Sequence, residues 1–462
     1  MKIYGKGSAA SFINSLFIAY SLCGRTTTID SVGNRVRGGS MKTISRSIYF
    51  FFTCLFLLFG AVSAYAADQK EKKQPYNVET AEIISNLKSC SFDAAFAAAD
   101  GFVNKTVNAD NFKQDKHIAL LERGKIALAS DKLDQAITDL QEAEKKFLMI
   151  EGTISLTEGF GSILTDDTVQ EYEAEMHEKL MISPYLTMAY LLKNDLDGAV
   201  VERNRTINKI NQYIESNLEE RSYLENPFAR LMSAIVYEME GRNDDAAIEY
   251  KKMKSDNETS RMENRKDKSS DLVLIFDMGL SPQKYEEKWG PTTISAAGKS
   301  ITLGFAYAAY KPTNSGLSDV SISIDGKPAG APKILYDLEK TILAQYDKNK
   351  SSLVAKIVAR MTAKAVAQVG IQAATDKIAD NIPFGGFLFK KAAQAAGAKW
   401  IADEQADLRG WRTLPKNIQY LRINGLEAGE HIIKINYGSE SQTKKVQINN
   451  NSINTTYFVV AN

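Results

Sequence analysis

Cysteine and histidine are scarce in this chain, and their scarcity limits the kinds of site that it can build. The 462 residues include only three cysteines and three histidines. They form no cluster with the spacing of a metal site. We interpret the histidines as ordinary helix or turn residues; they are His117, His177 and His431. The sequence therefore predicts no metal, no cofactor and no disulfide framework.

The chain also lacks an excess of charge of either sign. It holds 57 Lys and Arg against 56 Asp and Glu, whereas domains that bind nucleic acid are usually strongly basic. The first 66 residues contain seven basic residues and one acidic residue, so the remainder contains 50 and 55. This mildly acidic remainder argues against nucleic acid or anionic lipid as a partner.

The motifs of common enzyme active sites are missing as well. The sequence has no nucleophile elbow and no glycine-rich loop that could cradle a phosphate. Residues 193–198 resemble the start of a calcium loop. However, Lys193 stands at its first ligand position and Asn204 at the twelfth, where a bidentate Glu is needed. We therefore expect a protein that is not an enzyme.

One hydrophobic run near the beginning has the form of a signal peptide. Lys42 and Arg46 precede an apolar run of roughly 15 residues, which is short of the ~20 needed to cross a bilayer. The small-x-small sequence Ala64-Tyr65-Ala66 that follows is typical of a signal peptidase site. We interpret residues 41–66 as a cleaved signal peptide and residues 1–40 as a mispredicted extension.

The cysteines agree with export in a form that carries no lipid anchor. Neither Cys23 nor Cys54 is preceded by the small residues of a lipoprotein signal. After cleavage Cys90 would be the single cysteine, so no internal disulfide could form. We expect a soluble periplasmic protein, beginning with a charged, disordered stretch over residues 67–79.

Small residues at regular spacings predict a tetratricopeptide-like α-solenoid over residues 80–254. Three helical hairpins are expected, over residues 115–147, 184–213 and 226–253. Their aromatic residues could line a groove for a peptide or fill the seams between hairpins, and we favour the seams. The tyrosines in question include Tyr190, Tyr237 and Tyr250.

Between the first two hairpins, residues 151–171 interrupt the repeat. This segment is too apolar to be merely solvated, so it is interpreted as either a lid or a loop packed onto the helices. We favour the packed loop. Residues 255–271 contain one apolar residue, Met262, and are interpreted as a linker.

The pattern then alternates with a period of two, which predicts a β-sandwich over residues 272–462. A helical hairpin is expected as an insertion at about 333–405, because small residues recur there at four-residue steps. Such steps also occur in membrane helices. Charged residues interrupt every possible span, so insertion into a membrane is not expected.

Residues 406–423 return the chain from the helical insertion to the strands, and we call them the joint. Trp411 and Leu414 are candidate apolar anchors, and Arg409 and Arg412 are candidates for ion pairing. Pro415 prevents a helix from continuing through the segment. Trp411 with Arg412 could be a structural plug or a binding hot spot, and we favour the plug.

Two resemblances follow from these residues. The tail resembles a PEGA-type sandwich module in its turns Asp325-Gly326-Lys327 and Gly429-Glu430-His431. More broadly, the chain is similar to a family of exported bacterial proteins at residues 161–167, 191–205, 226–228, 237, 241–250 and 406–421. Members of that family have a tetratricopeptide-like front and a strand-rich back. The resemblance implies a role in the bacterial cell envelope that is linked to cell-wall assembly.

These observations lead to one expected function and one alternative. The expected function is a non-enzymatic scaffold that binds a protein or peptide partner in the envelope. The alternative is a module that binds cell-wall polymer, or an envelope enzyme with an acidic site that the sequence does not reveal.

Overall fold

The structure, a computed structural model, describes most of the chain beyond residue 73. The described residues are 74–156, 171–216, 224–263, 270–296, 299–314, 319–369 and 406–461. All of them lie in one compact unit, Lys73–Asn462. They mix α-helices and β-strands, which confirms the predicted α+β class. The predicted extension and signal peptide, most of the interrupting loop and the second helix of the inserted hairpin lie outside the described residues.

Helices make up the first part of this unit. They are α3 (Tyr76–Glu79), α4 (Ala81–Lys88), α5 (Phe92–Asn108), the 3-10 helix η1 (Asp110–Asp115), α6 (Lys116–Ala129), α7 (Leu133–Leu156), α8 (Met176–Leu192), α9 (Leu196–Ser216), α11 (Pro227–Met239), α12 (Asn243–Lys252) and α13 (Asp256–Glu263). Helix α4 packs against α5, α6 against α7, α8 against α9, and α11 against α12. Each of these pairs is a hairpin with a short turn.

The turns between these helices share one backbone conformation. In each of them one residue has a positive φ; these residues are Cys90, Asp131, Asn194, Gly241 and, after α12, Lys254. After α6, the Lys132 N–H donates to the Ala127 carbonyl (2.8 Å) and the Asp131 N–H to the Leu128 carbonyl (3.3 Å). This is the Schellman pattern that closes a helix with a left-handed residue. The chain therefore reverses in the same way at each of these five turns.

Two segments differ from the sequence-based expectation because their side chains are held by distant parts of the chain. Tyr76, in the stretch expected to be disordered, forms helix α3 and is 4% exposed. Its hydroxyl donates to Glu122 at 2.8 Å. Part of the expected linker forms helix α13, in which Glu258 pairs with Arg422 (3.3 Å) and Arg261 with Glu238 (2.8 Å). Ion pairs of this range cannot be recognised from local composition.

The strands form three sheets. They are β1 (Asp271–Met278), β2 (Gln283–Ala296), β3 (Lys299–Lys311), β4 (Val320–Ile324), β5 (Lys327–Gly330), β6 (Lys333–Asp337), β7 (Asn417–Ile423), β8 (Gly429–Tyr437), β9 (Glu440–Ile448) and β10 (Ile453–Val460). The first sheet has the order β10-β1-β7-β6, with β1 and β10 parallel. The second has the order β5-β4-β8-β9, and β2 and β3 form a separate hairpin.

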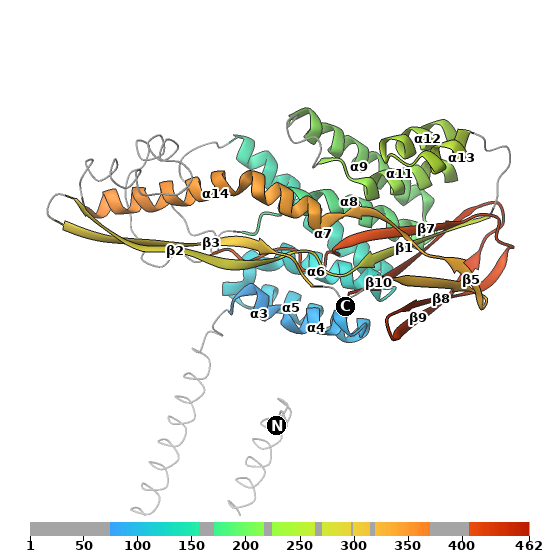
Figure 1. The fold of residues 1–462 in the computed structure, drawn as a ribbon, viewed down its shortest axis with the longest axis horizontal. Helices are drawn as coiled ribbons and strands as arrows, with labels where there is room; N and C mark the ends of the chain where they lie inside the picture. The colour runs from blue at the N-terminus through green and yellow to red at the C-terminus, as the bar shows by residue number, and fades with distance from the viewer. Residues whose placement is uncertain are drawn as a thin grey trace, which may run out of the picture. The chain divides into compact units, whose positions relative to one another are not determined.

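The predicted helical insertion begins later than expected. Residues 333–337 form strand β6, which pairs with β7, and helix α14 (Leu338–Val369) follows. Strand β6 can form because β7, more than 80 residues further along the chain, offers its edge. Helix α14 packs along β3 (Figure 1).

The first sheet lies between the helices and the second sheet. Every residue of β1 is buried. On one face of β1, Val273 and Ile275 belong to the core shared with the helices. On the other face, Leu274 and Phe276 belong to a core shared with β4, β8 and β9, where Phe276 stacks on Phe458 with ring centroids 5.5 Å apart. Figure 1 shows β1 and β7 running beneath α8 and α11. The chain thus covers one side of its helical array with its own sheet.

Candidate functional site

The joint, residues 406–423, lies against the N-terminal helices. Trp411 is 2% exposed, and its ring meets that of Tyr185 in α8 edge to face, with centroids 6.0 Å apart. Leu414 is buried beside it. We expected these anchors to pack between the inserted hairpin and the strands. The contacts that the structure describes are instead with helices far upstream, so the joint connects the two halves of the unit.

Two buried glutamates hold the backbone of the joint. The Glu122 carboxylate in α6 accepts hydrogen bonds from the N–H groups of Arg412 (2.8 Å) and Thr413 (3.0 Å). The Glu178 carboxylate in α8 accepts one from the Trp411 N–H at 2.6 Å. Three successive backbone donors are thereby satisfied by carboxylates, which form stronger hydrogen bonds than neutral acceptors do. Sequence analysis missed both glutamates, because acidic residues in helices usually face solvent.

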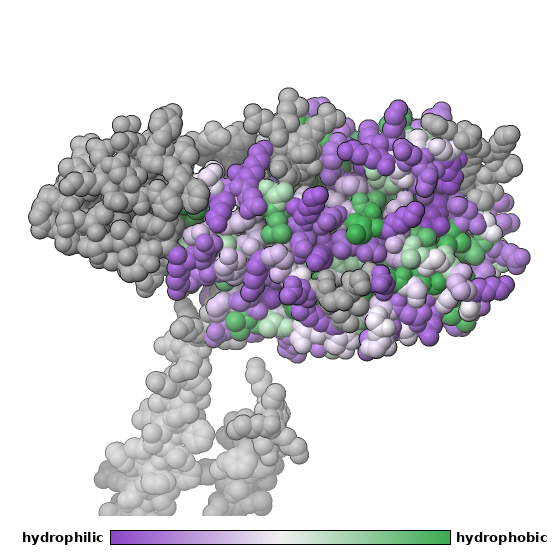
Figure 2. Space-filling view, viewed as in Figure 1, coloured by the Kyte–Doolittle hydropathy of each residue, from purple (hydrophilic) through white to green (hydrophobic). Residues whose placement is uncertain are grey.

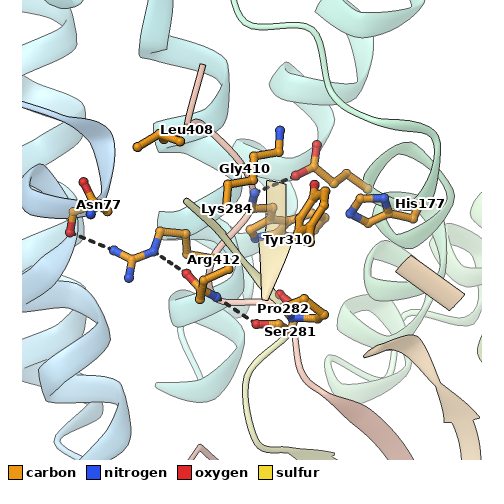
Figure 3. A pocket seen from close by; sticks show the side chains of 12 residues that line it. Asn77, His177, Ser281, Pro282, Lys284, Tyr310, Leu408, Gly410 and Arg412 are labelled. Atoms are coloured by element: carbon orange, nitrogen blue, oxygen red, sulfur yellow. Dashed lines mark hydrogen bonds between the residues drawn. The ribbon is translucent and has the colours of Figure 1, made fainter. Parts of the chain in front are cut away.

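The arginines of the joint extend the same network. Arg412 donates to Gln283 (2.6 Å), to the Thr80 hydroxyl (2.6 Å) and to the Asn77 carbonyl (3.0 Å). Figure 3 shows its guanidinium between Asn77 and the loop of Ser281 and Pro282. In the described part of the chain, Arg412 thus forms hydrogen bonds to neutral groups instead of the predicted ion pair. Its pKa is lowered by burial, which the Glu122 charge offsets only in part.

Arg409, the other arginine expected to form ion pairs, contacts two aspartates. Its guanidinium contacts Asp407 at 2.7 Å and Asp115, at the end of η1, at 3.1 Å. Its carbonyl accepts a hydrogen bond from Lys284 of β2 at 2.7 Å. Residues 407–413 are therefore bonded to α3, η1, α6, α8 and β2.

Burial of Glu122 raises its pKa, although the hydrogen bonds from Thr413, Arg412 and Tyr76 partly counteract this effect. The side chain has no exposed surface. A carboxyl group with a raised pKa can serve as a catalytic acid when a substrate can reach it. Because protein donors surround Glu122, its arrangement fits a structural role in the joint.

A second buried charge cluster, around Tyr250, links the helices to the first sheet. The Arg422 guanidinium in β7 contacts Glu238 (2.8 Å) and Asp271 (3.1 Å). It also donates to the Tyr250 hydroxyl at 2.7 Å. Arg261 of α13 pairs with Glu238 as well. The Tyr250 hydroxyl therefore lies among buried charged side chains at the contact between the helices and the first sheet. Burial raises the pKa of Tyr250 well above the usual value.

A third cluster buries an ion pair between α6 and β1. The Lys125 ammonium lies 2.5 Å from the Asp277 carboxylate, and neither side chain is more than 2% exposed. The same carboxylate accepts from the hydroxyls of Tyr185 (2.8 Å) and Tyr457 (2.7 Å). A buried pair of this kind is retained only when further hydrogen bonds satisfy it. Here the two tyrosine hydroxyls bind one carboxylate oxygen, Oδ2, whereas Oδ1 is buried without a hydrogen-bond partner among the described residues.

The remaining two candidate tyrosines lie elsewhere. The Tyr190 ring covers Gly198, where an added Cβ would come within 2.3 Å of the ring. Its hydroxyl accepts from Gln141 of α7 at 3.0 Å. Tyr237 lies between two guanidiniums, those of Arg203 (3.9 Å) and Arg242 (4.6 Å). Tyr190, Tyr237 and Tyr250 therefore occupy three separate packing positions rather than one common groove.

A cavity of about 570 Å³ opens where α14, β3 and the start of α8 meet. It lies in the size range of small-molecule sites. Its lining is mixed and consists of Glu173, Ala174, Glu175, Met176, Lys179, Lys284, Ala306, Tyr307, Ala308, Tyr310, Ile342, Gln345, Tyr346, Asn349, Leu353, Ile357, Ala406 and Asp407. We call it the α14 cavity. Because its walls come from five separate segments, no sequence motif marked it.

A smaller pocket of about 20 Å³ adjoins the α14 cavity and shares Lys284 and Tyr310 with it. Figure 3 shows these two side chains beside His177. The rings of His177 and Tyr310 meet edge to face, with centroids 6.4 Å apart. The smaller pocket has room for little more than a water molecule.

The ionic groups at the edge of the α14 cavity influence one another strongly. Burial raises the pKa of Glu175, but the Lys284 ammonium and His177 outweigh this effect and lower it to about 2. Burial lowers the pKa of Lys284, and Glu175 and Glu178 reverse this and raise it. The pKa of Tyr310 is raised well above its usual value by burial and then by the charges of Glu175 and Glu178. Glu175 and Lys284 are thus charged, and Tyr310 protonated, at neutral pH.

Within the described residues, no group of three or more His, Cys, Asp or Glu could hold a metal ion. No helix in the described ranges is long and apolar enough to cross a membrane. Comparison with protein-family models, curated proteins and solved structures finds no match to the chain.

Proposed function

We propose that the chain is an exported, non-enzymatic scaffold of the bacterial cell envelope that binds a protein partner and is linked to cell-wall assembly. It would consist of a tetratricopeptide-like α-solenoid and a β-sandwich with a helical insertion. The repeated helix-closing turns support the solenoid. The core shared by the two four-stranded sheets supports the sandwich. Neither nucleic acid nor a membrane-inserted form is part of the proposal.

The observation that carries this proposal is the distribution of exposed aliphatic side chains on the helices. The sheet covers part of the array through contacts with α6, α8 and α11. The second helix of each hairpin, by contrast, carries large aliphatic side chains about half exposed: Val107, Leu148, Met149, Val201 and Ile248. Val201 and Ile248 each follow the left-handed residue of their turn by seven positions. The helical repeat thus presents equivalent apolar groups to the outside.

The visible surface is mostly hydrophilic, with hydrophobic residues in separate patches (Figure 2). Apolar anchors surrounded by polar residues are typical of protein interaction surfaces. The partner would accordingly dock on the second helices, because the chain's own strands already cover part of the first helices.

The test is a pull-down from an envelope extract with the full chain at near-native amounts. We expect one discrete protein partner. The double variant Val201→Glu/Ile248→Glu should lose that partner while keeping its circular dichroism spectrum. The matched control, Asp197→Asn, changes one exposed side chain on α9, the helix that carries Val201, and should retain it. A partner captured equally well by the double variant, or no partner at all, would contradict the proposal.

A further inference from the structure

We propose that the α14 cavity binds a short, uncharged oligosaccharide. This goes beyond the scaffold function, because the cavity lies among α14, β3 and the start of α8, away from the second helices. Three properties of the cavity favour such a ligand: its size, the pairing of its charged groups, and the order of the side chains along α14.

The charged groups in the lining cancel one another. Lys284 pairs with Glu175, and Lys179 lies 3.2 Å from Glu173. Asp407 is engaged by Arg409 at 2.7 Å. A ligand with a net charge would find no uncompensated partner here and would lose its hydration. The cavity therefore favours an uncharged occupant.

Hydrogen-bonding groups occupy the middle of the helical wall. Gln345, Tyr346 and Asn349 line the cavity from neighbouring positions on α14. The two amides can each donate and accept, which matches the hydroxyl groups of a sugar. The Tyr346 hydroxyl is buried and has no hydrogen-bond partner among the residues that the structure describes. Burial and the nearby Glu287 raise the pKa of Tyr346 to about 12, so the hydroxyl remains a donor at neutral pH.

Aromatic and aliphatic side chains complete the walls. Tyr310 and Tyr346 meet edge to face, with ring centroids 5.6 Å apart. Along α14, Ile342 lies on one side of the polar positions, and Leu353 and Ile357 lie on the other. Sugar rings present C–H faces and hydroxyl edges together, so they can use both kinds of wall. An alkyl chain would instead desolvate the two amides without returning a hydrogen bond.

Isothermal titration calorimetry on the full chain tests this proposal with cellotriose and chitotriose as probes. We expect saturable binding of at least one of these uncharged trisaccharides. Trigalacturonate, of similar size but negatively charged, should bind at least tenfold more weakly. The double variant Gln345→Ala/Asn349→Ala should weaken binding by about thirtyfold, because it removes two hydrogen bonds worth about 1 kcal/mol each.

The matched control is Ser351→Ala, a small polar change on α14 outside the lining, which should leave the dissociation constant unchanged. Alanine favours helix, so all three substitutions should preserve the circular dichroism spectrum. Three outcomes would overturn the proposal. They are no saturable binding of either uncharged sugar, equal binding by the double variant, and saturable binding only of an uncharged polyoxyethylene detergent below its micelle concentration.

Discussion

Replacing Trp411 with alanine tests whether the joint holds the helices and the sheets together. The side chain is 2% exposed and packs edge to face on Tyr185. A buried aromatic residue removes about 150–250 Å² from water. At about 25 cal/mol per Å², this corresponds to about 4–6 kcal/mol as an upper value. Measured truncations of buried Phe or Trp to Ala cost about 3–5 kcal/mol.

We therefore expect Trp411→Ala to lower the free energy of unfolding by about 3–5 kcal/mol. Urea denaturation followed by circular dichroism measures this change, with the m-value showing whether the same surface is exposed. Limited proteolysis provides a second measurement. Cleavage should become faster in the joint itself, because loss of the indole loosens the segment that Glu122 and Glu178 hold.

Trp411→Phe is the matched control. The indole N–H has no hydrogen-bond partner among the described residues, so phenylalanine loses packing area but no hydrogen bond. It should cost less than half as much as alanine. If Trp411→Ala changed the free energy of unfolding by less than about 1 kcal/mol, within the range of ordinary surface substitutions, Trp411 would not be a buried anchor. The binding hot spot that we set aside would then be the better interpretation.

Three further predictions follow from other contacts. Glu122→Ala leaves the N–H groups of Arg412 and Thr413 without their acceptor, which should cost about 2–6 kcal/mol in urea unfolding; a cost under 1 kcal/mol would show that water replaces the carboxylate. Lys254→Gly should raise the free energy of unfolding by about 0.5–1 kcal/mol, because Lys254 has φ +59°, which glycine adopts without strain. The control Lys251→Gly, inside α12, should lower the free energy of unfolding by about 1 kcal/mol, and a change of the same sign in both variants would refute the turn geometry. In NMR titrations His431 should have a pKa above 6.5, because Glu427 and Asp325 accept its hydrogen bonds; Asp325→Asn should lower it.

The sign of the His431 effect on stability follows from the same shift. A folded-state pKa above the unfolded value means that the protonated ring is favoured in the native protein. This contribution is fully present below pH 6.5 and is lost as the pH rises through the raised pKa. The pKa of Asp325 is lowered by the Ile432 N–H and by His431. Its contribution is present above pH 3.8 and is lost at lower pH. An unchanged His431 pKa in Asp325→Asn would contradict the contact.

Local patterns were sufficient wherever neighbouring residues decide the conformation. Alternation in residues 320–324 predicts strand β4, and Asp325-Gly326 predicts its turn, since both residues adopt positive φ. Strand β2 was not predicted, because its residues are largely polar and include Gly290-Pro291. It pairs with β3 nonetheless, and the register shifts between Trp289 and Thr292. The hairpin partner overrides the weak local preference.

The sequence by itself determined the α+β class, most of the strands, the turns between the helices and the apolar anchors of the joint. These follow from periodicity and from residues with strong conformational preferences. Only the tertiary structure decided that Trp411 meets α8, that Glu122 and Glu178 bind the backbone of the joint, and that the α14 cavity exists. The reason is physical: a helical glutamate looks the same in sequence whether it faces water or a backbone N–H group. Which of these it faces depends on what the fold brings to it from nearly 300 residues away.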